Sequence, residues 1–283
     1  MTDAEATQAQ VPTIRLNTGA RMPQLGFGVF QVPAEDVEDV VTTALAVGYR
    51  SIDTAAMYRN EEGVGRALKS SGIARDELFV TTKLSNPAHR AGAVERAVDE
   101  SLGKLGLDRL DLYLIHWPLP PVDRYVEVWN SLAKIHSDGR ITSIGVSNFQ
   151  PAHLERLFAE SDVVPAVNQV ELHPYLAQEA LRRFHAEHGI ATEAWSPLGA
   201  GGELLEDETV SGIAEKYGVT PAQAVIRWHL QVGNVVIPKS VTAERIRSNF
   251  DVFGFELDPD DVDAISGLDR DERLGPDPDT FNP

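Results

Sequence analysis

Short apolar segments rich in branched residues alternate along the chain with longer segments that have helical periodicity. Eight apolar segments are typical of buried strands: Leu25–Val29, Ser51–Asp53, Leu78–Lys83, Asp111–His116, Ser143–Ser147, Ala166–Val170, Ala191–Trp195 and Val235–Pro238. Helices are predicted over Ala34–Val47, Glu61–Ser71, Ala91–Leu105, Val122–Ser137, Pro151–Glu160, Gln178–His188 and Pro221–Gln231. Alternation of this kind predicts an α/β fold in which a parallel sheet closes into a (β/α)8 barrel, the TIM barrel.

The two ends of the chain depart from this alternation. Residues 1–10 are polar and are expected to form a flexible N-terminal tail, which leaves residues 11–283 as a single barrel domain. The segment Thr13–Pro23 contains the turn residues Asn17-Thr18-Gly19 and predicts an N-terminal β-hairpin. Asp269–Pro283 is rich in Asp and Pro and predicts a short, irregular C-terminal tail on the surface.

A doubly wound nucleotide-binding fold is the structural alternative. That fold carries a Gly-x-Gly-x-x-Gly turn between an early strand and a helix. The first predicted strand reads Gly26-Phe27-Gly28-Val29-Phe30-Gln31 and lacks the third glycine. The sequence therefore favours the barrel.

Composition narrows the classes of function. The chain has 25 Lys and Arg residues against 43 Asp and Glu residues, and this net charge of −18 disfavours binding to nucleic acid or anionic lipid. The absence of cysteine excludes disulfides and thiolate metal sites. Without an apolar run near ~20 residues or an export signal, the protein is expected in the cytoplasm. His185 and His188 lack a third ligand, so we predict a surface helix there and no metal site.

Four polar residues stand at or near the ends of consecutive predicted strands: Asp53, Tyr58, Lys83 and His116. Active sites of such barrels lie at the carboxyl ends of the strands, so these side chains are expected to converge. Each has an ordinary structural explanation when taken alone. Together they predict a proton donor, because a buried Lys83 ammonium would lower the tyrosine pKa from about 10.

In this arrangement Asp53 would keep Lys83 charged, and His116 would orient a carbonyl oxygen. Such a group donates protons and cannot donate hydride, which implies a reduced cofactor. An alternative makes Lys83 the Schiff-base nucleophile of an aldolase, which requires a neutral amine.

The chain also resembles the aldo-keto reductase family over nearly its whole length. The resemblance lies in Gly48–Glu61, Val80–Leu84, Leu114–Pro118, Gly145–Phe149, Asn168-Gln169 and Ile237–Thr242. The tail Arg273–Pro278 is similar to the short tails of bacterial 2,5-diketogluconate reductases. The resemblance implies a (β/α)8 barrel that reduces carbonyls with NADPH, with Tyr58 as general acid, Lys83 and Asp53 tuning it, and His116 orienting the substrate.

The family pattern also implies a set of cofactor-binding residues. Those around the nicotinamide and pyrophosphate are Ser147, Asn148, Gln169, Trp195, Ser196 and Leu198, and those around the adenosine are Lys239, Ser240, Val241, Thr242, Arg245 and Asn249. NADPH is favoured over NADH, because Lys239, Arg245 and the Ser240 hydroxyl suit a 2′-phosphate.

The expected substrate pocket is walled by Phe30 and Trp117. A short tail should leave it open to small dicarbonyls, ketoaldehydes and keto sugar acids. A monomer is expected from the family resemblance. The non-enzymatic alternative is a regulatory barrel that binds NADPH without catalysis, although binding alone does not require Tyr58.

Overall fold

The computed structural model describes residues 11–90 and 92–282, so the expected tail over residues 1–10 lies outside the described residues. The first described element is the predicted hairpin, formed by β1 (Thr13–Arg15) and β2 (Arg21–Pro23). The two strands are antiparallel, with Ile14 opposite Met22.

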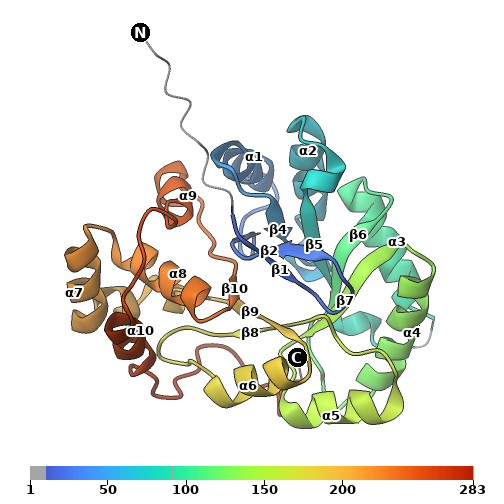
Figure 1. The fold of residues 1–283 in the computed structure, drawn as a ribbon. Helices are drawn as coiled ribbons and strands as arrows, with labels where there is room; N and C mark the ends of the chain where they lie inside the picture. Colours follow the sequence, from blue (N-terminus) through green and yellow to red (C-terminus); the bar gives the residue numbers. More distant parts are fainter. Residues whose placement is uncertain (1–10, 91, 283) are drawn as a thin grey trace.

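Eight parallel strands follow and form one sheet in chain order. They are β3 (Phe27–Gly28), β4 (Ser51–Asp53), β5 (Phe79–Leu84), β6 (Leu110–Ile115), β7 (Ile141–Ser147), β8 (Val167–Glu171), β9 (Ala191–Trp195) and β10 (Val235–Val236). The sheet closes where Gly26 N donates to Val236 O and Val236 N donates to Gln24 O, each over 2.9 Å. The predicted (β/α)8 barrel is confirmed (Figure 1).

Helices surround the strands. They are α1 (Val37–Val47), α2 (Glu61–Ser70), α3 (Val94–Leu105), α4 (Tyr125–Ser137), α5 (Pro151–Glu160), α6 (Glu179–Glu187), α7 (Glu208–Tyr217), α8 (Pro221–Gln231), α9 (Ala243–Phe250) and α10 (Pro259–Ser266). The helices predicted from the sequence pattern do not include α7, α9 or α10; α10 buries a single residue, Ile265, and so has little apolar periodicity. No described helix is long and apolar enough to cross a membrane.

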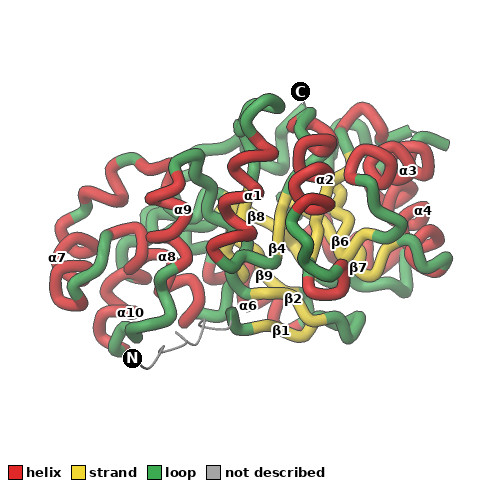
Figure 2. The backbone as a smooth tube through the Cα atoms, turned by 90° about the horizontal axis from the view of Figure 1, so that it is seen from above, coloured by secondary structure: helices red, strands yellow, loops and turns green. Residues whose placement is uncertain are grey.

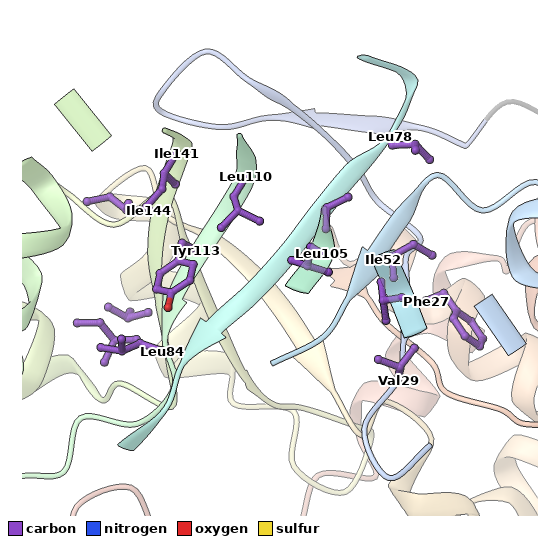
Figure 3. Packing of buried hydrophobic residues seen from close by; sticks show 14 of the residues in the cluster. Phe27, Val29, Ile52, Leu78, Leu84, Leu105, Leu110, Tyr113, Ile141 and Ile144 are labelled. Carbon is purple, nitrogen blue, oxygen red and sulfur yellow. The ribbon is translucent and has the colours of Figure 1, made fainter. Parts of the chain in front are cut away.

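Apolar residues pack on both faces of the barrel wall. Figure 3 shows Leu110, Tyr113 and Ile144 on neighbouring strands, within the large cluster that packs beneath the helices. A second cluster contains Leu16 and Met22 of the hairpin region together with strand residues such as Leu112. The hairpin therefore packs against the amino-terminal end of the barrel. The end of the chain lies on the side opposite the hairpin (Figure 2), where Phe281 packs on Trp117, just after the carboxyl end of β6.

The close packing of β7 against β8 depends on a glycine. A Cβ atom added at Gly145 would lie 2.5 Å from Val167 O and 2.8 Å from a Leu114 methyl carbon. Backbone cannot move away as a flexible side chain can, so a larger residue at this position would force the strands apart.

We expect Gly145→Ala to lower the free energy of unfolding by about 1–3 kcal/mol, because the methyl group has no space. Gly212→Ala is the matched control, since Gly212 lies within α7 with nothing within 4 Å of an added Cβ. The control should be neutral or stabilising by up to about 1 kcal/mol. Urea unfolding of both variants checks this; equal stabilities would contradict it.

Candidate active site

The Lys83 ammonium lies at the centre of the polar end of the barrel. Its Nζ donates to Asp53 Oδ1 over 2.5 Å, to Thr54 O over 2.9 Å and to Tyr58 Oη over 3.4 Å. The Lys83 side chain has no exposed surface, and that of Asp53 is 3% exposed. All three ammonium protons have acceptors, which is the condition under which a buried cation is tolerated.

A short turn places Tyr58 beside this ammonium. Tyr58 ends the 3-10 turn η1 (Ala56–Tyr58), and the next residue, Arg59, has a left-handed φ of 57°. Asn60 fixes the turn: its Oδ1 accepts from Thr54 Oγ1 over 2.8 Å, and its Nδ2 donates to the carbonyl oxygens of Val29 and Val32. The loop after β4 is thereby tied to the loop after β3.

The local environment sets the charges of these groups. Burial lowers the pKa of Lys83, but Asp53 and the other neighbours outweigh it, so the net pKa is raised and the amine stays an ammonium. Burial raises the pKa of Tyr58, and the Lys83 charge opposes that shift without reversing it. The sequence-based expectation of a lowered Tyr58 pKa is therefore corrected: desolvation of the phenolate dominates.

His116 completes the group of four. Its ring lies edge-on to the Tyr58 ring, with centroids 5.8 Å apart. Burial, then the charges of Lys83 and His89, lower the pKa of His116 to about 3. The imidazole is therefore neutral near pH 7 and has one N–H to donate.

Gln169 connects these residues to the far side of the barrel. Its Nε2 donates to Asp53 Oδ2 and to Glu193 Oε2, each over 2.8 Å. Gln169 stands on β8 and Asp53 on β4, so the first bond crosses the barrel interior. Glu193, on β9, has no exposed surface.

Ser147 and Asn148 lie at the end of β7, next to Gln169. Ser147 Oγ donates to Gln169 O over 2.8 Å, and Asn148 Nδ2 donates to Ser147 Oγ over 3.1 Å. Trp195 Nε1 donates to Asn148 Oδ1 over 2.8 Å, which fixes the half-buried indole. Asn148 and Ser196 have φ values of 65° and 48°, a conformation that non-glycine residues adopt mainly where the surroundings enforce it.

The residues expected around the adenosine gather after β10 and along α9. Lys239 and Arg245 are exposed cations on either side of the start of α9. Ser240 and Asn249 are buried, and Ser240 Oγ accepts from Thr242 N over 3.2 Å. Val241 is half exposed, and Leu198 packs against the core from the loop after β9. Cations beside a helix N-terminus suit a phosphate group.

Aromatic residues border the group formed by Asp53, Tyr58, Lys83 and His116. Phe30 is 53% exposed, and its ring centroid lies 5.1 Å from that of Tyr58. Met57, which the sequence analysis did not identify, is also exposed. Trp117 is 9% exposed, because Phe281 of the tail packs on it with ring centroids 4.3 Å apart.

The C-terminal tail is irregular as expected, but it is anchored rather than free on the surface. The buried Glu171 side chain accepts from Leu274 N over 2.6 Å and from Gly275 N over 2.8 Å. A Cβ atom at Gly275 would lie 2.5 Å from Trp195 Cη2, so the backbone runs directly against the indole. The tail therefore lies against Trp195 and Trp117, which were expected in the cofactor site and the substrate pocket.

The expected surface position of His185 is wrong. His185 is fully buried, and its ring nitrogens contact Asn168 Nδ2 over 2.8 Å and Thr192 Oγ1 over 2.9 Å. The side chain lies on the face of α6 that packs against β8 and β9. Among the described residues, no three or more His, Cys, Asp or Glu side chains are grouped as metal ligands.

Comparison with known proteins identifies the family. The model of the aldo/keto reductase family matches residues 23–270. An aldo-keto reductase of Mycolicibacterium smegmatis is 56% identical over 271 residues, which cover 96% of this chain and 98% of that protein. The chain belongs to the aldo/keto reductase family. The resemblance predicted from its motifs is confirmed.

Other members of the family are similar to this chain over nearly its whole length. Methylglyoxal reductase DkgA of Escherichia coli K12 is 53% identical over 96% of this chain and 99% of that protein. A solved structure of a Gox0644 mutant in complex with NADPH has a TM-score of 0.92 and 50% identity, over 96% of this chain and 99% of that one. A solved structure of an aldo/keto reductase from Brucella melitensis has a TM-score of 0.89 and 53% identity, over 92% of this chain and 100% of that one.

Two buried acids of this aldo/keto reductase, Glu171 and Glu193, were not predicted from the sequence. Each stands within or directly after a predicted apolar strand, where a carboxylate must be paired or neutral. An acidic residue within or directly after an apolar strand was the signal in the sequence that could have identified both positions.

We expect Glu171→Ala to release the tail of this aldo/keto reductase, because two backbone N–H groups lose a charged acceptor. Hydrogen exchange of the peptide over residues 270–283 should quicken at least about tenfold. Glu203→Ala, which removes only the exposed pair with Arg270, is the control and should leave exchange unchanged. Equal exchange in both variants would contradict the anchoring.

Proposed function

We propose that this aldo/keto reductase is an NADPH-dependent oxidoreductase that reduces the carbonyl group of small aldehydes and ketones to an alcohol. One observation carries the proposal: the Lys83 ammonium joins the Asp53 carboxylate to the Tyr58 hydroxyl at the end of the barrel opposite the hairpin. A positioned and protonated phenol beside a buried cation is suited to protonate an oxygen on which negative charge develops.

The residues present suit NADPH at both ends of that molecule. Trp195 offers an aromatic face whose orientation is fixed by Asn148, and Gln169 presents a side-chain amide from the strand next to that of Trp195. Lys239 and Arg245 supply cations for a 2′-phosphate. The NADPH complex of the Gox0644 mutant, at 50% identity, supports this choice. When bound, NADPH supplies the hydride that side chains cannot.

In the proposed reaction the carbonyl carbon accepts hydride while the Tyr58 hydroxyl donates its proton to the carbonyl oxygen, which yields an alcohol. Lys83 stabilises the phenolate that remains, and Asp53 keeps Lys83 charged and in place. His116, neutral with its lowered pKa of about 3, orients the carbonyl oxygen by a hydrogen bond.

For the substrate we propose small dicarbonyls, ketoaldehydes and keto sugar acids. The relative DkgA, named as a methylglyoxal reductase and 53% identical over nearly the whole chain, supports the first two classes. The anchored tail, with Phe281 against Trp117, limits the space available above the catalytic group. A compact substrate fits this arrangement better than an extended one.

The two alternatives have less support. A Schiff-base aldolase needs a neutral Lys83, whereas the neighbouring Asp53 raises the pKa of that amine. A regulatory barrel that only binds NADPH has no need for a tyrosine hydroxyl held beside a buried ammonium.

We expect Tyr58→Phe to reduce turnover by about 10²–10⁴-fold, because the variant lacks the proton donor. NADPH affinity should stay unchanged, since the hydroxyl serves chemistry rather than binding. NADPH oxidation with methylglyoxal and cofactor titration measure the two quantities. Tyr217→Phe, whose hydroxyl bonds to Asp261 on the outer helices, is the control. Normal turnover of the Tyr58 variant would remove the acid role.

We expect Arg245→Ala to weaken NADPH binding about 10–100-fold and to leave NADH binding nearly unchanged, because a charge-assisted bond to the 2′-phosphate is lost. Arg247→Ala is the control, as Arg247 is exposed on the same helix. Titration calorimetry with both nucleotides gives the comparison. An equal loss for NADPH and NADH would show that Arg245 does not contact the 2′-phosphate.

A further inference from the structure

The Gln169 side chain has both of its amide protons committed to carboxyl groups. One Nε2 proton is donated to Asp53 Oδ2 and the other to Glu193 Oε2, over 2.8 Å in each case. A primary amide has two donor protons on nitrogen and acceptor capacity only on oxygen. The Nε2 atom is therefore saturated, and Oε1 is the polar atom that Gln169 has left for a ligand.

This arrangement removes an ambiguity that glutamine side chains ordinarily have. The amide can rotate by half a turn and exchange its donor and acceptor ends at little steric cost. Here a half turn would place Oε1 against the Asp53 carboxylate, which has no proton to donate, and leave its acceptor oxygen unpaired. Asp53 thus fixes which end of Gln169 is presented to the cofactor site, and Glu193 accepts the second Nε2 proton.

Glu193 differs from Asp53 in its charge. Asp53 is paired with the Lys83 ammonium, whereas Glu193 Oε1 is buried and has no hydrogen-bond partner among the described residues. The titratable groups around Glu193 are Asp53 on β4, Lys83 on β5 and Tyr58 on η1. Burial, followed by the charge of Asp53, raises the pKa of Glu193 to about 8, so the group is largely a neutral acid at pH 7.

We propose that Glu193 is a positioning residue that, together with Asp53, holds the Gln169 amide with its carbonyl oxygen toward the nicotinamide carboxamide. A neutral carboxyl group accepts the Gln169 proton through its carbonyl oxygen without adding a second negative charge beside Asp53. The proton-donating group and the cofactor-orienting amide then form one hydrogen-bonded unit. This inference rests on the proposed use of NADPH.

Two substitutions distinguish the role of Glu193 as a hydrogen-bond acceptor from its role in filling space. Glu193→Gln keeps a neutral acceptor of the same shape, whereas Glu193→Met fills a similar volume and offers only a weak thioether acceptor. We expect Glu193→Met to weaken NADPH binding about tenfold or more in fluorescence titration. Glu193→Gln should recover most of that affinity. Equal affinity of the Met variant and the unaltered protein would overturn the proposal.

A double-mutant cycle tests whether Glu193 acts through Gln169. In a Gln169→Met background, Glu193→Met should cause no further loss of NADPH affinity, because the amide that it positions is absent. Additive losses would overturn the proposal. If the unaltered protein fails to bind NADPH at all, the proposed function fails instead, so the two failures are distinguishable.

A measurement on the unaltered protein covers the case in which Glu193→Met does not fold. The side-chain amide protons of Gln169 can be observed by nitrogen-15 NMR and assigned by their loss in Gln169→Met. One of them should shift as the pH rises through about 8, when Glu193 loses its proton. The shift should be absent in Glu193→Gln. Amide protons that do not respond to pH, or that respond equally in both proteins, would overturn the proposal.

Discussion

A lysine ammonium without solvent contact is the constraint on which the site depends. Removing such a charge from water costs several kcal/mol, and only a close opposite charge and full hydrogen bonding offset that cost. Asp53 supplies the charge, and the Thr54 carbonyl and the Tyr58 hydroxyl accept the remaining protons. The position of Tyr58 beside Lys83 is therefore part of what makes the buried ammonium tolerable.

The same constraint extends across the barrel. Asp53 needs partners for both carboxylate oxygens; one faces Lys83, and the other accepts from Gln169 on the opposite wall. Gln169 in turn reaches Glu193. A barrel of eight strands is narrow enough for side chains from opposite strands to meet in its interior. Charge compensation for one lysine thus couples Tyr58 to Gln169 and Glu193 on the far side of the barrel.

The two ends of the barrel are closed by different means. The hairpin packs Leu16 and Met22 against the amino-terminal end, and Asn17 and Thr18 of its turn add hydrogen bonds there. At the carboxyl end the tail is held by Glu171 and lies against Trp195. Hydrogen bonds to a buried carboxylate fix the position of the tail more narrowly than apolar contacts alone would.

Local patterning by itself determined the barrel, because strand and helix periodicities are properties of short segments. It also placed Asp53, Lys83 and His116 at strand ends, and so predicted their convergence. The tertiary structure alone decided the partners of Gln169, the burial of His185 and the anchoring of the tail. Glu171 contacts residues more than 100 positions away, and Gln169 reaches Asp53 over a similar separation. Pairing at that range depends on how strands face each other across the closed barrel, which no local pattern encodes.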